Sequence, residues 1–327
     1  MTVTTPFLCM DIKDTLLDAL NLALEKMGGF LQDTVGNLIG KWIYTGAKEL
    51  IDRGAYIYNV FINKAYSLLV TSPASWAGDG WDAVEKLNNS LMILASTLVC
   101  IFFLIGYCKE SLDVKQEIRI ESILKMFMKL SIAEFFVTQS LYIVCWMFDL
   151  INYFTQDKIG PISFENISNV SDAIVKAQAE NGDTYPFGML LVALLIALVF
   201  FATAGVVSVL IFYLALMRMF KIITMIPLGT LASATIAGDH QLSQSAVSFY
   251  KYALNCVFEA GEMIFAMALY VRVADNVPGL IVPGLSADSI GDYSDFSIYM
   301  VIQILLMITL YGAVKQAPEI IRRGLNL

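Results

Sequence analysis

Long apolar runs of low charge follow one another along most of the chain and predict membrane-spanning helices. Lipid offers the backbone no hydrogen-bond partners and penalises charge, so about 20 apolar residues in succession are typical of one transmembrane helix. Five runs fit this description: residues 87–108, 130–154, 184–217, 252–271 and 296–314. The pattern therefore predicts an all-α polytopic membrane protein with about five transmembrane helices.

The third run is longer than one crossing requires. Residues 184–217 are 34 uncharged residues, and at about 1.5 Å per residue they exceed a hydrocarbon core of roughly 30 Å. Two spans and a turn would not fit comfortably in this length. We therefore expect a single long helix that either tilts and projects beyond the bilayer or bends near Gly205.

The segment that follows, residues 221–239, predicts an interruption. Pro227 lacks a backbone N–H group and crowds the preceding helical turn, and Gly229 follows closely. The segment is also rich in small residues, which permit close helix packing. We interpret it as a broken, interfacial or re-entrant piece, with a short additional span as the alternative. Arg218, Pro227 and Gly229 are the candidate residues of this structural break.

The chain divides into an N-terminal amphipathic helical region, residues 1–86, and a five-span region, residues 87–327. In the first region, residues 12–27 place apolar side chains on one face at helical spacing. Residues 55–70 are apolar but contain two asparagines and a lysine, which is typical of a helix at the membrane interface or in an oligomer contact. Residues 72–81 are rich in turn-forming residues and predict a linker.

Composition strengthens the membrane prediction and argues against several functional classes. Hydrophobic residues make up 57% of the 327 residues and charged residues only 15%, whereas soluble domains are about 25% charged. His240 is the single histidine and the five cysteines form no CxxC pair, so histidine-cluster metal sites and Ser-His-Asp triads lack material. The net charge of −8, without a basic patch, argues against direct duplex-DNA binding. We expect no enzyme and no cofactor.

Lysine and arginine alternate between successive loops and predict an orientation. Residues 109–129 carry five basic residues, whereas residues 155–183 carry two basic residues against five acidic ones. The segment between the third and fourth runs and the C-terminal tail are again basic. Because basic loops stay on the cytoplasmic side, the N-terminus is predicted outside and the C-terminus in the cytoplasm.

Two glutamates interrupt the fourth run. Glu259 and Glu262 stand three residues apart, so both carboxylates lie on one helix face, and that face should avoid lipid. One interpretation is a polar pore or ion path, with a ring of carboxylates if the chain oligomerises. The other is a structural role near an interface, with the carboxylates paired to Arg218, Lys221 or Lys251.

Glu134 and Asp149 stand near the two ends of the second run. Charge is tolerated there because the side chains can reach the membrane interface. We favour interfacial anchoring for both and keep them, with Glu259 and Glu262, as candidate polar residues inside the membrane. A small-solute or ion transporter that uses intramembrane glutamates is accordingly the alternative function.

The combination of features resembles a known family of membrane proteins. A polar outer loop precedes the long third run, which ends in the sequence LALMRMFKIITMIPLG at residues 214–229 and continues into SATIAGDHQLSQS at residues 233–245. Together with the N-terminal amphipathic region and the five spans, these stretches resemble the VirB6/TrbL-like inner-membrane proteins of type IV secretion (conjugation) systems. The form found in conjugative elements of Gram-positive bacteria is the most similar.

This resemblance implies a non-enzymatic channel or scaffold subunit in the bacterial cytoplasmic membrane. Such a subunit helps pass a DNA–relaxase substrate across that membrane and touches it only transiently. The resemblance further implies a homo-oligomer, with a pentamer as the expected assembly. It also implies contacts with a VirB4-type ATPase and with external stalk or pilus subunits.

Overall fold

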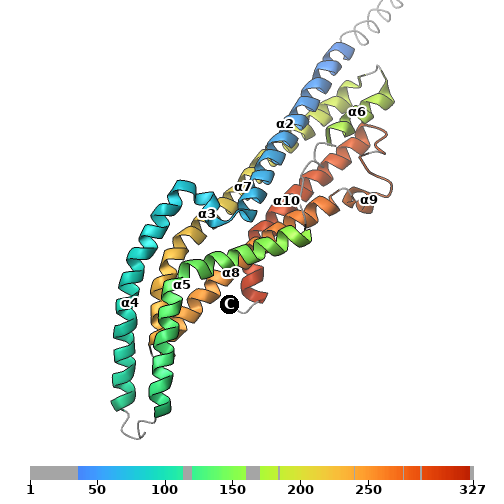
Figure 1. Ribbon diagram of the computed structural model, residues 1–327. Coiled ribbons are helices and arrows are strands. Elements are labelled where there is room, and N and C mark those ends of the chain that lie inside the picture. The colour runs from blue at the N-terminus through green and yellow to red at the C-terminus, as the bar shows by residue number, and fades with distance from the viewer. Residues whose placement is uncertain are drawn as a thin grey trace, which may run out of the picture. The chain divides into compact units, whose positions relative to one another are not determined.

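The structure, a computed structural model, is helical throughout the part of the chain that it describes (Figure 1). It describes residues 36–112, 120–159, 170–182, 185–238, 240–274, 276–287 and 289–324. The α-helices are α2 (Gly36–Val70), α3 (Pro73–Ala77), α4 (Trp81–Leu112), α5 (Ile120–Ile159), α6 (Val170–Asn181), α7 (Phe187–Ala234), α8 (His240–Val273), α9 (Val277–Ile281) and α10 (Tyr293–Gly324). Two 3-10 turns complete them, η2 (Gly78–Gly80) and η4 (Thr235–Ala237). The all-α prediction is confirmed.

Five helical segments are long and apolar enough to cross a membrane, which confirms the predicted number of spans. They are Pro73–Lys109, Leu124–Leu150, Phe187–Ala237, Leu242–Val273 and Tyr293–Ile321. Each overlaps one of the predicted runs. The first and the fourth differ most in how much of the span is buried by the rest of the chain. The first buries 11% of its most apolar stretch inside the chain and the fourth buries 50%. The α4 helix therefore presents most of its apolar surface outward, whereas α8 lies among other helices.

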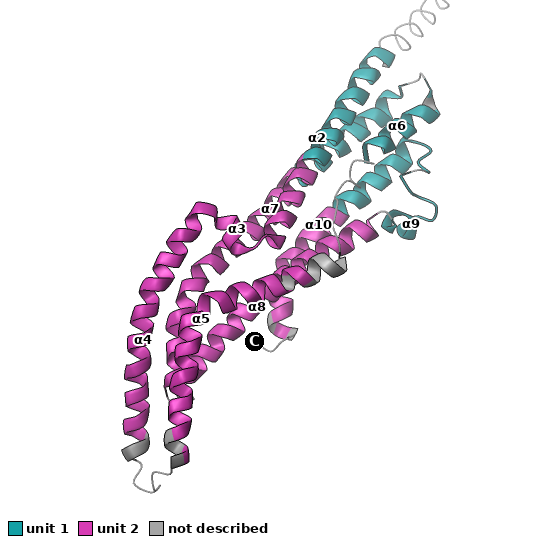
Figure 2. Ribbon diagram, viewed as in Figure 1, with its two compact units in different colours: residues 1–56, 166–204, 275–305 teal, residues 57–165, 205–274, 306–327 magenta. Residues whose placement is uncertain are grey.

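The described residues fall into two compact units, drawn in different colours in Figure 2. Unit 1 contains residues up to 56, residues 166–204 and residues 275–305. Unit 2 contains residues 57–165, 205–274 and 306–327. The helices α2, α7 and α10 each contribute residues to both units.

Close approach of α2 to α7 organises unit 1. A side chain at Gly54 would meet the backbone of Phe201 at 3.1 Å and the ring of Phe200 at 3.2 Å, so only glycine fits there without a shift. Small residues at a helix–helix contact are typical of membrane proteins because they let the backbones approach. A side-chain hydrogen bond from Tyr293 to Gln178 joins α10 to α6 in the same unit.

In unit 2, α4 and α5 pack with the end of α7, the turn η4 and the start of α8. One buried cluster contains larger apolar side chains: Val84, Leu141, Val144, Phe148, Met219, Ile222, Met225, Ile226, Ala253, Cys256 and Val257. A second contains only alanine and valine at its core: Ala95, Val99, Ala133, Val137, Ala234 and Ala237. The start of α4 shares the first cluster with the later part of α5, and its later part shares the second cluster with the first part of α5, so the two helices run antiparallel (Figure 1).

The predicted interruption in residues 221–239 does not appear in the backbone. Helix α7 continues through Pro227 and Gly229 to Ala234, and only then tightens into η4. A proline removes one helical hydrogen bond, and the helix here lies close against Ser140 and Phe249 at Gly229. The Thr230 hydroxyl donates to the Pro227 carbonyl at 2.7 Å and the Ser233 hydroxyl donates to the Gly229 carbonyl at 2.7 Å.

The N-terminal region is described from residue 36 onward. Residues 12–27 lie outside the described residues, and residues 55–70 form the second half of α2. Their apolar face is buried inside the chain at Ala55, Tyr58, Ile62, Ala65 and Leu69. Other side chains of this half are exposed, among them Tyr56 and Val60, so a position at the membrane interface or in an oligomer contact stays a prediction.

The predicted linker, residues 72–81, is built from short helical pieces. Ser72 caps α3 by accepting a hydrogen bond from the Ser75 backbone N–H at 3.3 Å. Pro73 takes the first helical position, where its missing N–H group costs nothing. Gly78 then adopts a φ of 51°, which glycine tolerates, and η2 leads directly into α4.

Two glycines of α7 provide a matched test of this packing. A side chain at Gly229 would collide with the Ser140 hydroxyl and meet the Phe249 ring at 3.2 Å, whereas nothing lies within 4 Å of one at Gly205. We expect Gly229→Ala to lower the free energy of unfolding by about 1–3 kcal/mol. Gly205→Ala should leave it unchanged or raise it by up to about 1 kcal/mol, because alanine favours the helix. Thermal unfolding of the detergent-solubilised protein measures both, and equal effects would contradict the packing.

Candidate functional site

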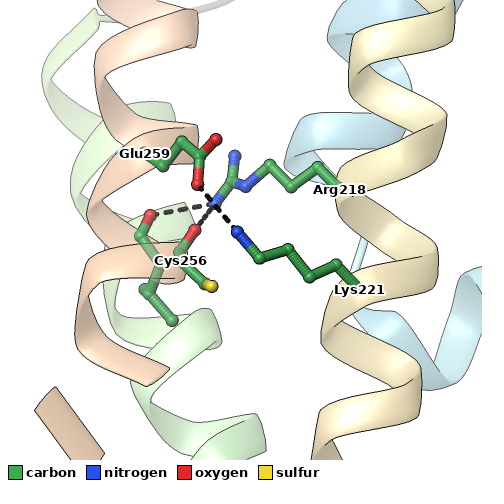
Figure 3. A network of polar contacts seen from close by, with 5 residues as sticks. Arg218, Lys221, Cys256 and Glu259 are labelled. Atoms are coloured by element: carbon green, nitrogen blue, oxygen red, sulfur yellow. Dashed lines mark hydrogen bonds and ion pairs between the residues drawn. The ribbon is translucent and has the colours of Figure 1, made fainter. Parts of the chain in front are cut away.

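A group of charged side chains lies between α7 and α8 inside unit 2 (Figure 3). Arg218 and Lys221 stand three residues apart on α7, and Cys256 and Glu259 stand three residues apart on α8, so each pair shares one helix face. Arg218 is 3% exposed and Glu259 is 8% exposed. Lysine, arginine and glutamate are almost never this buried without a partner of opposite charge. The contacts within the group therefore show how its buried charges are compensated.

The Arg218 guanidinium reaches across to the backbone of α8. Its Nη2 atom donates to the carbonyl oxygen of Cys256 and, at 3.2 Å, to that of Val257. Its Nε and Nη1 atoms have no hydrogen-bond partner within the described part of the chain. A guanidinium carries five N–H donors and cannot lose its charge, so this side chain keeps buried donors and a buried positive charge that a nearby carboxylate must balance.

Glu259 supplies that carboxylate. Its Oε2 atom lies 3.8 Å from the Nζ atom of Lys221, which makes an ion pair without a direct hydrogen bond. The Lys221 ammonium also lies over the Tyr252 ring, 5.0 Å from its centroid, and aromatic faces attract cations. The lysine side chain is 40% exposed while that of Glu259 is 10% exposed, so the ion pair joins the interior to the edge of the unit.

Glu262 lies one turn further along α8 and is only partly buried. Its Oε2 atom has no hydrogen-bond partner among the described residues. Glu259 is thus the glutamate that the structure brings to the α7 cations, and Glu262 is not in ion-pair contact with them. Of the three basic residues considered as partners from the sequence, Lys221 forms the ion pair. The pore interpretation of the two glutamates stays a prediction.

The other two acidic candidates lie apart from this group. Glu134 accepts a hydrogen bond from the Ser96 hydroxyl at 2.9 Å, which links α5 to α4. Asp149 is exposed on α5. Neither contacts the Arg218 group, and their predicted role in interfacial anchoring stays a prediction.

The arrangement suits electrostatic fastening of two helices better than covalent chemistry. The acceptors for Arg218 are backbone carbonyls, and the sequence carries no side-chain signal for these. The helical spacing of Arg218 and Lys221, opposite a glutamate in an apolar run, is the signal that could have located the group. Among the residues that the structure describes, no three His, Cys, Asp or Glu side chains are grouped to hold a metal ion.

Comparison with known proteins places the chain in a family. A family model described as "TrbL/VirB6 plasmid conjugal transfer like protein" matches residues 59–230, more than half of the 327 residues. The matched part contains Arg218 and Lys221 but ends before Glu259. No curated protein and no solved structure matches the chain.

The ion pair predicts unequal effects of two neighbouring substitutions. Glu259→Gln removes the one carboxylate of the described residues that interacts with the buried Arg218 and with Lys221, and we expect it to lower the free energy of unfolding by about 3 kcal/mol, as for other broken buried pairs. Glu262→Gln, the matched control, should change it by about 0.5 kcal/mol or less. Thermal unfolding in detergent measures both. The same loss in the two variants would show that Glu259 does not balance the α7 cations.

Proposed function

The chain belongs to the TrbL/VirB6 plasmid conjugal transfer family, and from this membership we propose that it is a channel or scaffold subunit of a type IV secretion machine. In this proposal it helps a DNA–relaxase substrate cross the bacterial cytoplasmic membrane and touches that substrate only transiently. The observation that carries the proposal is the family match over residues 59–230. It includes the first two candidate spans and most of the third.

The protein is a multi-pass membrane component of conjugal transfer, and the proposed assembly is a homo-oligomer, specifically a pentamer. Outward-facing apolar side chains on α4 support an assembly in the membrane: Leu87, Ile93, Leu94, Ile101, Leu104 and Ile105. Such a surface is stable against lipid or against another helix, and here it extends along most of the helix. A VirB4-type ATPase and external stalk or pilus subunits are the proposed partners outside the membrane.

The role proposed for the Arg218 group is to hold α7 and α8 at one fixed register. An ion pair with a buried carboxylate favours a single arrangement, because any sliding of one helix would strand the Arg218 charge in an apolar environment. A translocation subunit needs such rigidity at the helices that frame the substrate path. Both glutamates of the fourth candidate span, Glu259 and Glu262, lie after residue 230, where the family match ends. In this proposal their role is partly structural.

A transporter of small solutes or ions is the second candidate, since a carboxylate–lysine pair within candidate spans is a usual feature of ion paths. Flux of a small ion into liposomes that hold the purified protein separates the two proposals. Flux that disappears in Glu259→Gln favours transport, whereas no flux above empty liposomes favours the secretion subunit.

Conjugal transfer from a donor cell tests the main proposal directly. We expect an in-frame deletion of the gene to bring the transfer frequency to the detection limit while growth is unchanged, because the machine would lose its membrane conduit. The intact gene supplied in trans should restore transfer. Normal transfer by the deleted strain would overturn the proposal.

The proposed orientation, with the N-terminus outside and the C-terminus in the cytoplasm, predicts which cysteines a membrane-impermeant maleimide reaches. In a variant without the native cysteines, Glu180→Cys on α6 should be labelled in intact cells, because the acidic loop is outside. Glu121→Cys, in the basic loop ahead of the second candidate span, should be labelled only after the cells are opened. Both side chains are exposed, so accessibility does not favour either. The reverse pattern would invert the orientation.

A further inference from the structure

An open apolar groove lies on the surface of unit 2 between α5, η4 and α8. It has a volume of about 400 Å³ and is lined chiefly by carbon atoms, among them those of Ile132, Phe136, Val247 and Leu254. Pockets that hold small molecules are roughly 300–1,000 Å³ and mostly apolar, so the groove is large enough for a ligand. Ile132 is 47% exposed and Val247 is 55% exposed, which shows that the groove opens at the surface.

Only a few residues with polar groups line the groove, and their surroundings differ. The Tyr250 hydroxyl is hydrogen-bonded to the Ser233 hydroxyl at 2.7 Å, so its polar end is directed to α7 and its ring lines the groove. Lys251 also lines the groove, and its side chain is exposed. The wall of the groove is thus apolar, and Lys251 lines it through the carbon atoms of its side chain.

Within the described residues, Lys251 has no ion-pair partner of the kind that Lys221 has. It lies within the candidate span Leu242–Val273 and forms no ion pair with any residue in the described ranges. In the same unit, Lys221 is paired with Glu259. A lysine that faces hydrocarbon without an anion is costly, and such residues almost always find a partner.

We infer that this groove binds an anionic phospholipid, whose acyl chain lies along the apolar wall and whose phosphate pairs with Lys251. The chemistry on both sides is complementary: a hydrocarbon chain matches a wall of carbon atoms, and a phosphate supplies the negative charge that the lysine lacks. The groove lies within candidate spans, where phospholipid is the surrounding solvent. A helix of a second copy would fill the apolar wall but would need an acidic side chain opposite Lys251.

Photo-crosslinking of the full-length protein tests the site. The protein is reconstituted in phosphatidylcholine vesicles that contain a minority of phosphatidylglycerol with a diazirine on its acyl chain. After illumination, mass spectrometry of the digested protein locates the attached lipid. We expect attachment at the α5 and α8 residues of the groove, and the same probe on phosphatidylcholine should attach there about fivefold less, because its choline cation cancels the phosphate charge that attracts Lys251.

Two pairs of variants separate the contributions of charge and shape. Lys251→Gln should lower attachment of the phosphatidylglycerol probe about fivefold, whereas Lys86→Gln, at an exposed lysine of α4, should not. Val247→Trp should block the groove to both probes. Val206→Trp, at an equally open valine of α7, should block neither. Thermal unfolding of each variant shows whether it folds.

The inference fails if well-folded Lys251→Gln and the intact protein attach the phosphatidylglycerol probe equally, or if both probes attach equally. It fails as well if Val247→Trp leaves attachment in the groove unchanged. Crosslinks between two protein copies at these α5 and α8 residues would assign the groove to a second copy instead.

Discussion

Charge that is withdrawn from water must be balanced within a short distance, and this requirement ties α7 to α8. Arg218 cannot be neutral, and its buried position commits the structure to a carboxylate within reach. Glu259 interacts electrostatically with Arg218 and forms an ion pair with Lys221, and the backbone carbonyls of α8 accept hydrogen bonds from the guanidinium. The apolar clusters around Met219 and Val257 then pack at the level that the charges define. In an environment without water, the electrostatic contact sets the register and the dispersion contacts follow it.

Small side chains let the remaining helices meet at short range. Between lipid-exposed helices there is little hydrophobic gain from association, so close backbone contact has to supply much of the attraction. Gly54 provides it for α2 on α7 in unit 1, and Gly229 provides it for α7 on Ser140 and Phe249 in unit 2. The alanine–valine cluster around Ala95 and Ala234 follows the same rule. Many large apolar residues lie on the outer surface, where lipid can surround them, although others such as Phe148 and Phe200 are buried.

The sequence predicted what depends on composition and less of what depends on distant contacts. Five spans and the all-α class follow from the cost of burying charge and unpaired backbone in lipid, and these depend on local runs. The backbone does not break at Pro227, because a rule about one residue does not include the packing of the same turn against Ser140 and Phe249. The burial of one face of α2 was likewise not predicted, since its partners are far away along the chain.

The candidate site was likewise predictable from the sequence only in part. Glu259 and Glu262 are visible in the sequence because a carboxylate in an apolar run is unusual. Which of them meets the α7 cations is set by a pairing of residues about 40 positions apart, and by carbonyl groups that every residue possesses. Periodicity could place Arg218 and Lys221 on one face but not opposite a given turn of α8.

The proline within α7 gives this helix a built-in point of compliance. In a regular helix the carbonyl of Ile223 would accept from the N–H group at position 227, and proline has none to give. Bending at that turn therefore breaks one backbone hydrogen bond fewer than bending elsewhere in the 48-residue helix. Arg218 and Lys221 both precede that turn, so the charged contact lies on one side of it. A long helix with one flexible turn transmits displacement along its rigid part and bends at that turn.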